Sequence, residues 1–252
     1  MKIKIISKKN YPELKKLYSK FNVSEDADVC LAVGGDGTFI KAANEFEGPI
    51  LPIRSDEKNS TGYYADVGLK DMDFIIKSLL SKNYRIEELG RKIEVEYENS
   101  KYYGVNEILL KDVQEEVYFK LYYDERGKRS RLYEYTLSGD GFLVTSAIGS
   151  TAYNRTAGGP IILDRSVLCL TFLSIENPLA NSVILRKDEK LHVEIEKGRG
   201  VLSYDGMVIS DLNPGKSFDI RLSNKKVKVL RLKNRDEEFS EKLSRIIKSK
   251  MN

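Results

Sequence analysis

The hydrophobic pattern of this chain changes its period near Gly90, and this change constrains the fold more than any other feature of the sequence. Before Gly90, short apolar runs alternate with segments in which apolar residues recur every three or four positions, as strands and helices do in turn. Over most of 91–232, apolar and polar residues alternate, as in Ile93, Val95 and Tyr97, which is typical of half-buried strands. The sequence therefore predicts two domains of different architecture.

The first domain is expected to be an α/β domain with an open, mostly parallel sheet and flanking helices, because its elements alternate between strand and helix. The expected elements, in chain order, are a strand at Lys2–Ile6, a helix over about Pro12–Phe21, a strand at Val29–Val33, a helix over about Phe39–Phe46, a strand at Ile50–Ile53 and a helix capped by Asp71. The strand at Val29–Val33 is apolar throughout, which indicates burial on both faces of the sheet.

The second domain is expected to be an all-β, sandwich-like domain, because many short alternating segments are separated by turn residues. Asp205-Gly206 between two apolar runs is a strong signal for a type I′ hairpin. The last segment, Arg235–Met251, has helical spacing and is expected to return to the first domain. The predicted boundaries are 1–90 plus 235–252 for the α/β domain and 91–234 for the β domain.

Composition excludes several classes of protein. With 41% hydrophobic and 32% charged residues in 252, the chain resembles ordinary soluble proteins, and its longest apolar run, Val167–Leu173, is too short to span a bilayer. No secretory signal is recognised at the N-terminus, so a cytoplasmic protein without membrane contact is expected. A net charge of +4 does not indicate a nucleic-acid partner. One His and two separated cysteines, Cys30 and Cys169, predict no zinc site and no disulfide.

The first candidate for chemistry is the turn Gly34-Gly35-Asp36-Gly37-Thr38, which follows a buried strand and precedes a helix. Glycines let phosphates approach backbone N–H groups, and the helix start adds its positive end. Thr38 is expected to bind a phosphate oxygen or cap the helix, and Lys41 lies one turn further on. Asp36 is suited to hold Mg²⁺ or to accept a proton. A plain strand-to-helix turn, with Asp36 as a turn residue, is the alternative.

The second candidate runs from Gly139-Asp140-Gly141 to Gly158-Gly159-Pro160. It holds five glycines, the hydroxyls of Thr145, Ser146, Ser150 and Thr151, and the ring of Tyr153. Hydroxyls and backbone are suited to read the edge of a base, and a tyrosine ring packs against it, so this composition predicts a nucleoside pocket. The alternative is a polar surface loop. Ser174 is expected to approach this segment.

Two weaker signals follow. Asn106-Glu107 interrupts an apolar run, and the two side chains are suited to hydrogen-bond a ribose diol, although such a dipeptide is by itself most often uninformative. His192, the only histidine, alternates with Leu191 and Val193 and is expected on the polar face of a strand as a solvated or satisfied side chain.

Together, Gly34–Thr38, Asn106-Glu107 and GDGFLVTSAIGSTAYNRTAGGP at 139–160 resemble the NAD kinase family over most of the chain. The resemblance implies transfer of a phosphoryl group from ATP, another nucleoside triphosphate or polyphosphate, with Mg²⁺, to the adenosine ribose 2′-hydroxyl of NAD, giving NADP. It also implies a homodimer or homotetramer formed through the β domain. The β domain would bind NAD, and the α/β domain would bind the phosphoryl donor.

The resemblance also implies roles for individual residues. Asp36 is the expected general base. The glycine turn is expected to bind the donor through Gly34, Gly35, Gly37 and Thr38. The expected NAD-binding residues come from all three motifs and their neighbours, and they are Asp36, Gly37, Lys41, Asn106, Glu107, Asp140, Thr151, Ala152, Tyr153, Asn154, Arg155, Thr156 and Ser174.

The chain departs from the family pattern at two informative positions. Ile148 stands where a hydroxyl often precedes the glycine of the second motif, and Met207 follows Asp205-Gly206 where the family often has Gln. The glycine turn is also shared with lipid kinases of the diacylglycerol type. A lipid kinase and a non-catalytic dinucleotide-binding protein are therefore the alternatives to an NAD kinase.

Overall fold

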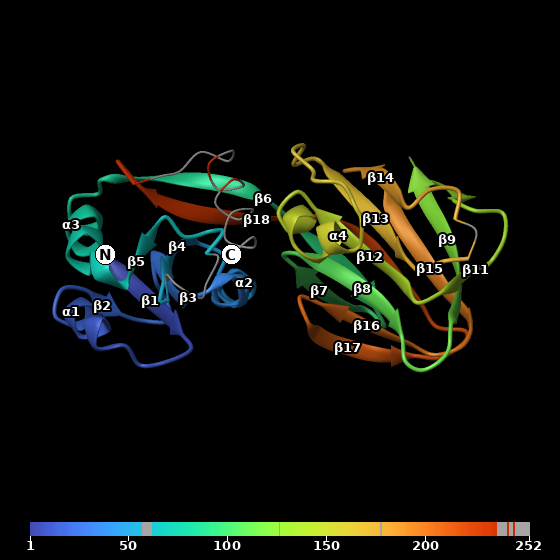
Figure 1. Cartoon of the computed structure of the whole chain (residues 1–252), viewed down its shortest axis with the longest axis horizontal. Helices are drawn as coiled ribbons and strands as arrows, with labels where there is room; N and C mark the ends of the chain where they lie inside the picture. Colours follow the sequence, from blue (N-terminus) through green and yellow to red (C-terminus); the bar gives the residue numbers. More distant parts are fainter. Residues whose placement is uncertain (57–61, 126, 177, 236–240, 242–243, 245–252) are drawn as a thin grey trace. The chain divides into compact units, whose positions relative to one another are not determined.

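The computed structural model describes residues 1–56, 62–125, 127–176, 178–235, 241 and 244. The chain divides into two compact units (Figure 1), which we call the α/β unit, Met1–Glu88 with Val227–Asn252, and the β unit, Leu89–Lys226. Nearly all of the helix expected at Arg235–Met251 lies outside the described residues.

The α/β unit has a parallel sheet in the order β18-β4-β3-β1-β2, with β5 also paired to β4. Its strands are β1 (Lys2–Ser7), β2 (Asn22–Val23), β3 (Val29–Gly34), β4 (Pro49–Arg54), β5 (Val67–Gly68) and the second half of β18 (Ser217–Leu232). Every residue of β3 is buried, as the sequence predicts for a central strand. The pairing of 228–229 with β4 places this end of β18 in the α/β unit rather than in the β domain of the sequence prediction.

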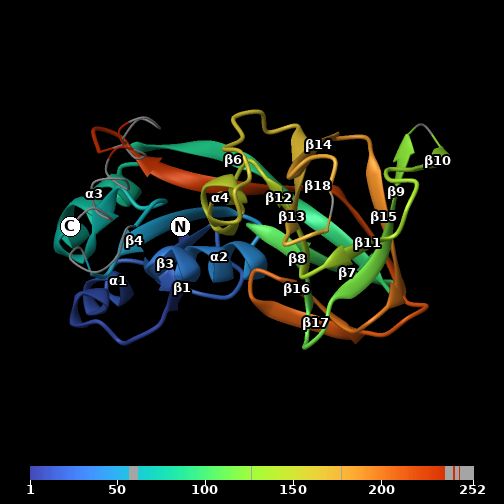
Figure 2. The same cartoon turned by 45° about the vertical axis from the view of Figure 1, so that its right-hand side comes forward.

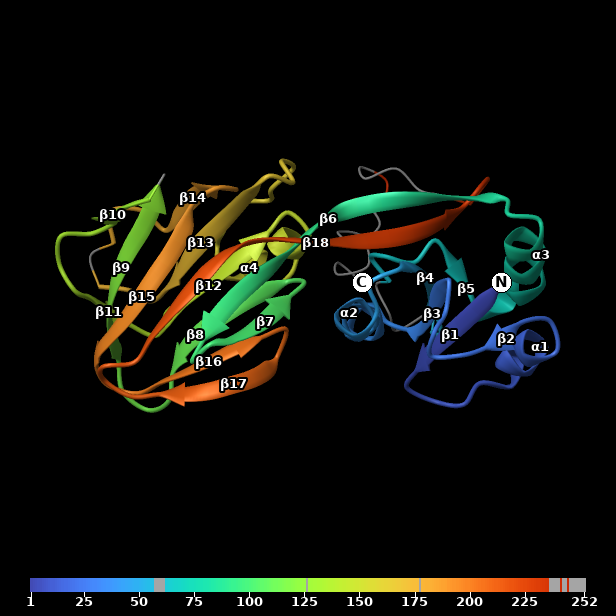
Figure 3. The same cartoon turned by 180° about the vertical axis from the view of Figure 1, so that it is seen from behind.

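Helices cover both faces of this sheet (Figure 3). They are α1 (Lys15–Tyr18) after the 3₁₀ turn Pro12–Leu14, α2 (Asp36–Glu45), and α3 (Met72–Leu80) after the 3₁₀ turn Leu69–Asp71. The side chains of Val29, Leu31 and Val33 share a core with α1 and α3, and α2 lies on the opposite face. This arrangement follows from the alternation of side chains along a strand.

Three helix expectations are corrected. The helix predicted from Phe39 begins at Asp36, because Gly35 takes the extended N-cap conformation. The helix predicted over Pro12–Phe21 is a 3₁₀ turn and a short helix that ends at Tyr18. Asp71 stands at the N-cap position of α3, but its carboxylate accepts the Gly68 N–H at 2.9 Å and makes no cap hydrogen bond to α3.

The β unit contains two sheets. The first carries β9 (Val117–Glu125), β10 (Lys128–Arg131), β11 (Leu137–Gly139), β15 (Lys190–Lys197), the first half of β18, and the hairpin of β6 (Tyr84–Tyr97) and β7 (Ser100–Gly104). The second sheet is antiparallel (Figure 2). Its strands, in order across the sheet, are β14 (Ser182–Arg186), β13 (Val167–Leu173), β12 (Gly141–Ser146), β8 (Glu107–Asp112), β16 (Gly200–Tyr204) and β17 (Met207–Leu212). After β12 come the 3₁₀ turn Gly149–Thr151 and α4 (Tyr153–Thr156).

The core of the β unit lies between these sheets, which confirms the sandwich-like domain. The rings of Phe119 on β9 and Phe142 on β12 pack with their centroids 5.2 Å apart. Asp205 and Gly206 join β16 to β17 with φ of +46° and +79°, so the predicted type I′ hairpin is confirmed. Cys30 and Cys169 are buried free thiols. None of the helices among the described residues has the length and apolar character needed to cross a bilayer.

A buried arginine ties β18 to the rest of the α/β unit. Arg231 is only 4% exposed, and its guanidinium donates to the Tyr64 carbonyl at 2.6 Å, to Asp66 Oδ2 at 2.9 Å and to Glu87 Oε2 at 3.0 Å. These contacts compensate for the cost of burying the charge.

We expect Arg231→Met to destabilise the protein by about 3–5 kcal/mol, because it leaves the buried Asp66 carboxylate without its cation. Urea denaturation of the wild type and the variant measures the difference. Lys2→Met is the matched control, since the Lys2–Asp26 pair is exposed and should add nothing measurable. Equal urea midpoints for Arg231→Met and the wild type would contradict a stabilising role for the buried ion pair.

Candidate functional site

In the α/β unit, the glycine turn joins the carboxyl end of β3 to the start of α2. Gly35 is the N-cap, and its carbonyl accepts the N–H of Thr38 at 2.9 Å. Asp36 and Gly37 form the first turn of α2, where backbone N–H groups have no partner within the helix. A Cβ on Gly37 would meet no atom within 4 Å among the described residues, and Gly37 is exposed, so the backbone here is accessible to a ligand. Bare N–H groups at the positive end of a ten-residue helix favour an anion.

Thr38 has a different place from the one predicted. Its side chain makes no cap hydrogen bond, and the residue is only 2% exposed. The hydroxyl packs against Gly34, where any Cβ would overlap it, and has no hydrogen-bond partner among the described residues. The expected cap is therefore wrong. Lys41 is exposed on α2, with Glu45 at 3.8 Å as a loose partner.

Asp36 is held by a residue from the segment after β4. Its Oδ1 accepts the Tyr64 N–H at 3.3 Å, and the Tyr64 ring stacks on Phe39 of α2 at a centroid distance of 4.2 Å. The Tyr64 carbonyl is bound by Arg231. Tyr64 is thus fixed at its N–H, its ring and its carbonyl, and it gives Asp36 a defined orientation at the helix start.

In the β unit, Asn106-Glu107 lies where β8 begins. The Asn106 carbonyl accepts the Thr145 hydroxyl at 2.6 Å, and Gly149 approaches so closely that a Cβ there would overlap the same carbonyl. The amides of Asn106 and Glu107 donate to Asp205 Oδ1 at 2.7 and 3.3 Å. The β12 segment and the β16–β17 hairpin therefore both fix this dipeptide.

Glu107 is the most perturbed acid among these residues. Its Oε2 is buried and has no hydrogen-bond partner among the described residues. Burial, and secondly the negative charge of Asp205, raise the pKa of Glu107 to about 7. A carboxyl poised near neutrality with an unpaired oxygen is typical of a functional site.

The segment at 139–160 is anchored near its start by β12, of which every residue is buried, and at its end by the Asn154 amide, which donates to the Pro160 carbonyl. Gly139 and Gly141 have positive φ, and a Cβ on either would overlap the Ser174 or Leu110 carbonyl. This contact brings Ser174 to the segment, as predicted. Asp140 lies between the two glycines, and its carbonyl accepts the Asp112 N–H at 2.8 Å.

The side chains that follow β12 divide into structural and accessible ones. Asn154 is fully buried; its amide donates to the Pro160 carbonyl at 2.8 Å and accepts the Thr171 hydroxyl at 2.6 Å. Its side chain therefore holds the segment together and is not offered to a ligand. Ser150 is likewise buried, and its hydroxyl donates to the Ala147 carbonyl. Tyr153 is 37% exposed, so its ring is available for the predicted packing against a base. The remaining predicted residues, Thr151, Ala152, Arg155 and Thr156, are partly or fully exposed.

Ile148, the first departure from the family pattern, is buried and packs against Gly90 within the β unit. It fills the core at a position where the family often carries a hydroxyl. Met207 stands at the start of β17 and is 41% exposed.

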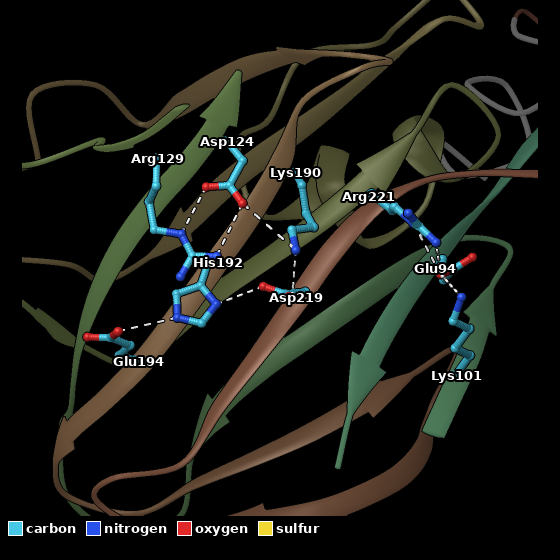
Figure 4. Close-up of polar contacts among 9 residues, drawn as sticks. All are labelled: Glu94, Lys101, Asp124, Arg129, Lys190, His192, Glu194, Asp219 and Arg221. Carbon is cyan, nitrogen blue, oxygen red and sulfur yellow. Dashed lines mark hydrogen bonds and ion pairs between the residues drawn. The ribbon is translucent and has the colours of Figure 1, made fainter. Parts of the chain in front are cut away.

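His192 belongs to a separate polar cluster on the first sheet of the β unit (Figure 4). Its Nδ1 lies 2.7 Å from Asp219 Oδ1 and its Nε2 lies 3.3 Å from Glu194 Oε1. The neighbouring ion pairs join Lys190 to Asp219 and Arg129 to Asp124. The expectation of a satisfied histidine is confirmed, and the cluster links β9, β10, β15 and β18 by ordinary surface contacts.

Sequence reasoning missed two residues that position this site. The sequence indicates only a turn at Asp205, although its carboxylate accepts the N–H groups of Val105 and Asn106, about one hundred residues away, just before β8 begins. Tyr64 lies outside the three motifs that carry the resemblance. The sequence does contain one signal for a second role of Asp205: among the residues common in type I′ turns, which are Asn, Asp and Gly, only Asp carries a charge.

Comparisons with known proteins identify the family to which this chain is similar. Residues 92–232 match the family model for the ATP-NAD kinase C-terminal domain. The chain is 27% identical to an NAD kinase of Caldicellulosiruptor saccharolyticus over 82% of this chain and 77% of that protein. It is 29% identical to an NAD kinase of Natranaerobius thermophilus over 84% of this chain and 76% of that protein.

Two solved structures share the fold. An NAD kinase from Archaeoglobus fulgidus in complex with ATP superposes with a TM-score of 0.75 at 19% identity and covers 99% of both chains. Yeast NADH kinase complexed with NADH superposes with a TM-score of 0.79 at 17% identity, covering 98% of this chain and 86% of that chain.

The raised pKa of Glu107 makes a prediction about stability. An acid whose pKa rises from 4.5 in the unfolded chain to about 7 in the folded protein keeps its proton longer in the folded state. Its contribution to stability is therefore lost as the pH rises through that window. The stability of Glu107→Gln relative to the wild type should therefore rise by about 2.5 kcal/mol between pH 5 and pH 8.

Chemical denaturation at both pH values measures this change. Glu116→Gln is the control, because Glu116 is exposed and its loss should leave the pH dependence of the wild type unaltered. A Glu107→Gln protein whose stability follows the wild type at both pH values would show that Glu107 ionises normally.

Proposed function

Because the chain belongs to the ATP-NAD kinase family, we propose that Asp36 is the general base of its reaction and that Asn106-Glu107 and the 139–160 segment bind NAD. The chain is an NAD kinase: it transfers a phosphoryl group from a donor such as ATP to the adenosine ribose 2′-hydroxyl of NAD, and the product is NADP. The observation that carries this conclusion is the family match over 92–232 in a chain that also has an open glycine turn with its own carboxylate.

The donor is bound at the start of α2 in this proposal. The exposed backbone at Gly37 and the helix end suit the terminal phosphates of ATP, another nucleoside triphosphate or polyphosphate. Mg²⁺ would enter with the donor and be held mainly by its phosphates, as is usual for this ion, so the Asp36 carboxylate stays available to accept the proton. When bound, the metal ion neutralises charge on the phosphates. The Thr38 side chain packs against Gly34 and so stabilises the turn.

The chemistry needs no covalent enzyme intermediate. The 2′-oxygen of NAD attacks the terminal phosphorus of the donor, the bond from that phosphorus to the leaving oxygen breaks, and the nucleoside diphosphate departs when ATP is the donor. The hydroxyl proton passes to the Asp36 carboxylate. The Tyr64 N–H keeps that carboxylate oriented, and the α2 N-terminus stabilises negative charge on the phosphoryl group.

The β unit supplies the NAD contacts. The side chains of Asn106 and Glu107 bind the ribose hydroxyls, and the Tyr153 ring packs on the adenine. Thr151, Ala152, Arg155 and Thr156 belong to the same segment and are expected to contact NAD. Asp140 is expected at the nicotinamide end, and Ser174, which lies against Gly139, at an NAD contact beside it. Asn154 contributes by holding the segment in place, since both ends of its amide are bonded within the fold.

A homodimer or homotetramer formed through the β unit is part of the proposal. Leu179 is 81% exposed just before the edge strand β14, and Ile184 on β14 is 51% exposed, which supports an interface at this edge. Light scattering on the purified protein tests it, and a monomeric mass would reject it. We place the protein in the cytoplasm, because both cysteines are free thiols.

The direct test incubates the protein with NAD, Mg²⁺ and either ATP or polyphosphate, and measures NADP with an NADP-specific dehydrogenase. We expect NADP with at least one donor. A diacylglycerol emulsion replaces NAD in a parallel reaction and should remain unphosphorylated. Phosphorylation of the lipid without NADP would instead support the lipid kinase, and NAD binding without turnover would support the non-catalytic protein.

We expect Asp36→Asn to lower turnover by about 10²–10⁴-fold, the usual contribution of a positioned base, with the fold intact. Asparagine keeps the size of the side chain and an acceptor for the Tyr64 N–H but does not accept the proton. The KM for NAD should change little, because the contacts from the β unit remain.

Steady-state kinetics measure this loss, and Glu45→Gln at the far end of α2 is the matched control that should keep wild-type turnover. Near wild-type turnover in Asp36→Asn would reduce Asp36 to a turn residue and make Asp140 or Glu107 the next candidate base.

A further inference from the structure

The Asp205 carboxylate makes contacts that a hairpin turn does not require. Its Oδ2 accepts the Val105 N–H at 2.7 Å, and its Oδ1 accepts the N–H groups of Asn106 at 2.7 Å and Glu107 at 3.3 Å. In return, the Asp205 N–H donates to the Glu107 carbonyl at 3.2 Å. Four hydrogen bonds thus join one turn residue to three consecutive residues of another segment.

These contacts satisfy amides that the sheet does not reach. The registers of β8 with β12 and β16 begin at Glu107 and Ile108, so Val105 and Asn106 precede the ladder. Buried backbone N–H groups need a partner, and a carboxylate that accepts several of them forms stronger hydrogen bonds than a neutral acceptor. Asp205 therefore determines the course of the main chain that presents the side chains of Asn106 and Glu107.

We propose that Asp205 is the positioning residue of the NAD site, which holds Asn106-Glu107 in register for the ribose by clamping their backbone. This inference rests on the proposed function, because it assigns a purpose to the residues expected to bind NAD. Asp205 itself need not touch the nucleotide. It acts through the main chain of its neighbours, and the hairpin is the means of delivering its carboxylate.

The same carboxylate has an electrostatic effect on Glu107. After burial, the charge of Asp205 is the second cause of the raised pKa of Glu107. Removing that charge should lower this pKa, whereas the contribution of burial remains. A residue that only formed a turn would leave the ionisation of Glu107 unchanged, so the pH profile separates the two roles.

Two substitutions keep the hairpin and remove the clamp in steps. Asp205→Asn and Asp205→Gly create Asn-Gly and Gly-Gly, both favoured in type I′ turns. Asparagine keeps one of the two acceptor oxygens but turns an NH₂ group toward at least one backbone donor. Glycine has no side chain and removes both acceptor oxygens. Glu98→Gln is the matched control, because Glu98 is also a turn residue with positive φ, and its exposed carboxylate contacts Lys216 and Tyr97 rather than the backbone of Val105–Glu107.

The measurements are KM for NAD, KM for the donor and the pH dependence of kcat/KM for NAD. We expect KM for NAD to rise about tenfold in Asp205→Asn and up to about 100-fold in Asp205→Gly, the size of one or two lost charge-assisted hydrogen bonds. KM for the donor should not change. The pH midpoint assigned to Glu107 should move to lower pH in both variants and stay in place in Glu98→Gln.

The thermal midpoint of each variant controls for folding, and amide hydrogen exchange at Val105 and Asn106 reports the clamp directly. Faster exchange with the expected rise in KM supports the proposal. If both folded variants bind NAD with wild-type KM and an unmoved pH midpoint, Asp205 is only a turn residue and the inference fails. A wild-type protein that makes no NADP from any donor would instead reject the proposed function, and this inference with it.

Discussion

The main chain from Val105 to Glu107 is the part of the β unit on which the candidate site depends. It precedes the ladder of β8, so its polar groups find partners elsewhere: the Asp205 carboxylate for the amides and the Thr145 hydroxyl for the Asn106 carbonyl. Gly149 lets the next turn approach the same carbonyl without a side chain between them. Because buried backbone groups must be bonded, these contacts leave the dipeptide a single course.

In the α/β unit, contacts from residues distant in sequence likewise fix the candidate catalytic residue. Asp36 stands at a helix start, and the residue that orients it, Tyr64, is itself bonded by the buried guanidinium of Arg231. In both units, a residue expected to carry chemistry is held by residues distant in sequence. Such support suits phosphoryl transfer, in which positioning and electrostatics supply most of the rate enhancement.

Local patterns predicted the architecture well because they depend on neighbouring residues. The apolar run of β3, the alternation that forms the sandwich and the Asp-Gly turn all carry their signal within a few positions. The start of α2 at Asp36 depends on the backbone conformation of Gly35, which no neighbouring side chain in the sequence reports. Burial is a tertiary property, so the sequence does not show that the side chain of Asn154 is bonded within the fold. The roles of Asp205 and Tyr64 depend on contacts across long stretches of sequence, which composition and spacing do not contain.

Phosphorus-31 NMR of the reaction can identify the oxygen of NAD that this chain phosphorylates. NAD, Mg²⁺ and the phosphoryl donor are incubated with the protein, and the products are observed without a coupling enzyme. We expect one new phosphomonoester resonance that matches authentic NADP, with the phosphate on the 2′-oxygen, formed in step with consumption of the donor. Donor consumption that yields only inorganic phosphate, or a phosphate on any other oxygen, would contradict this expectation.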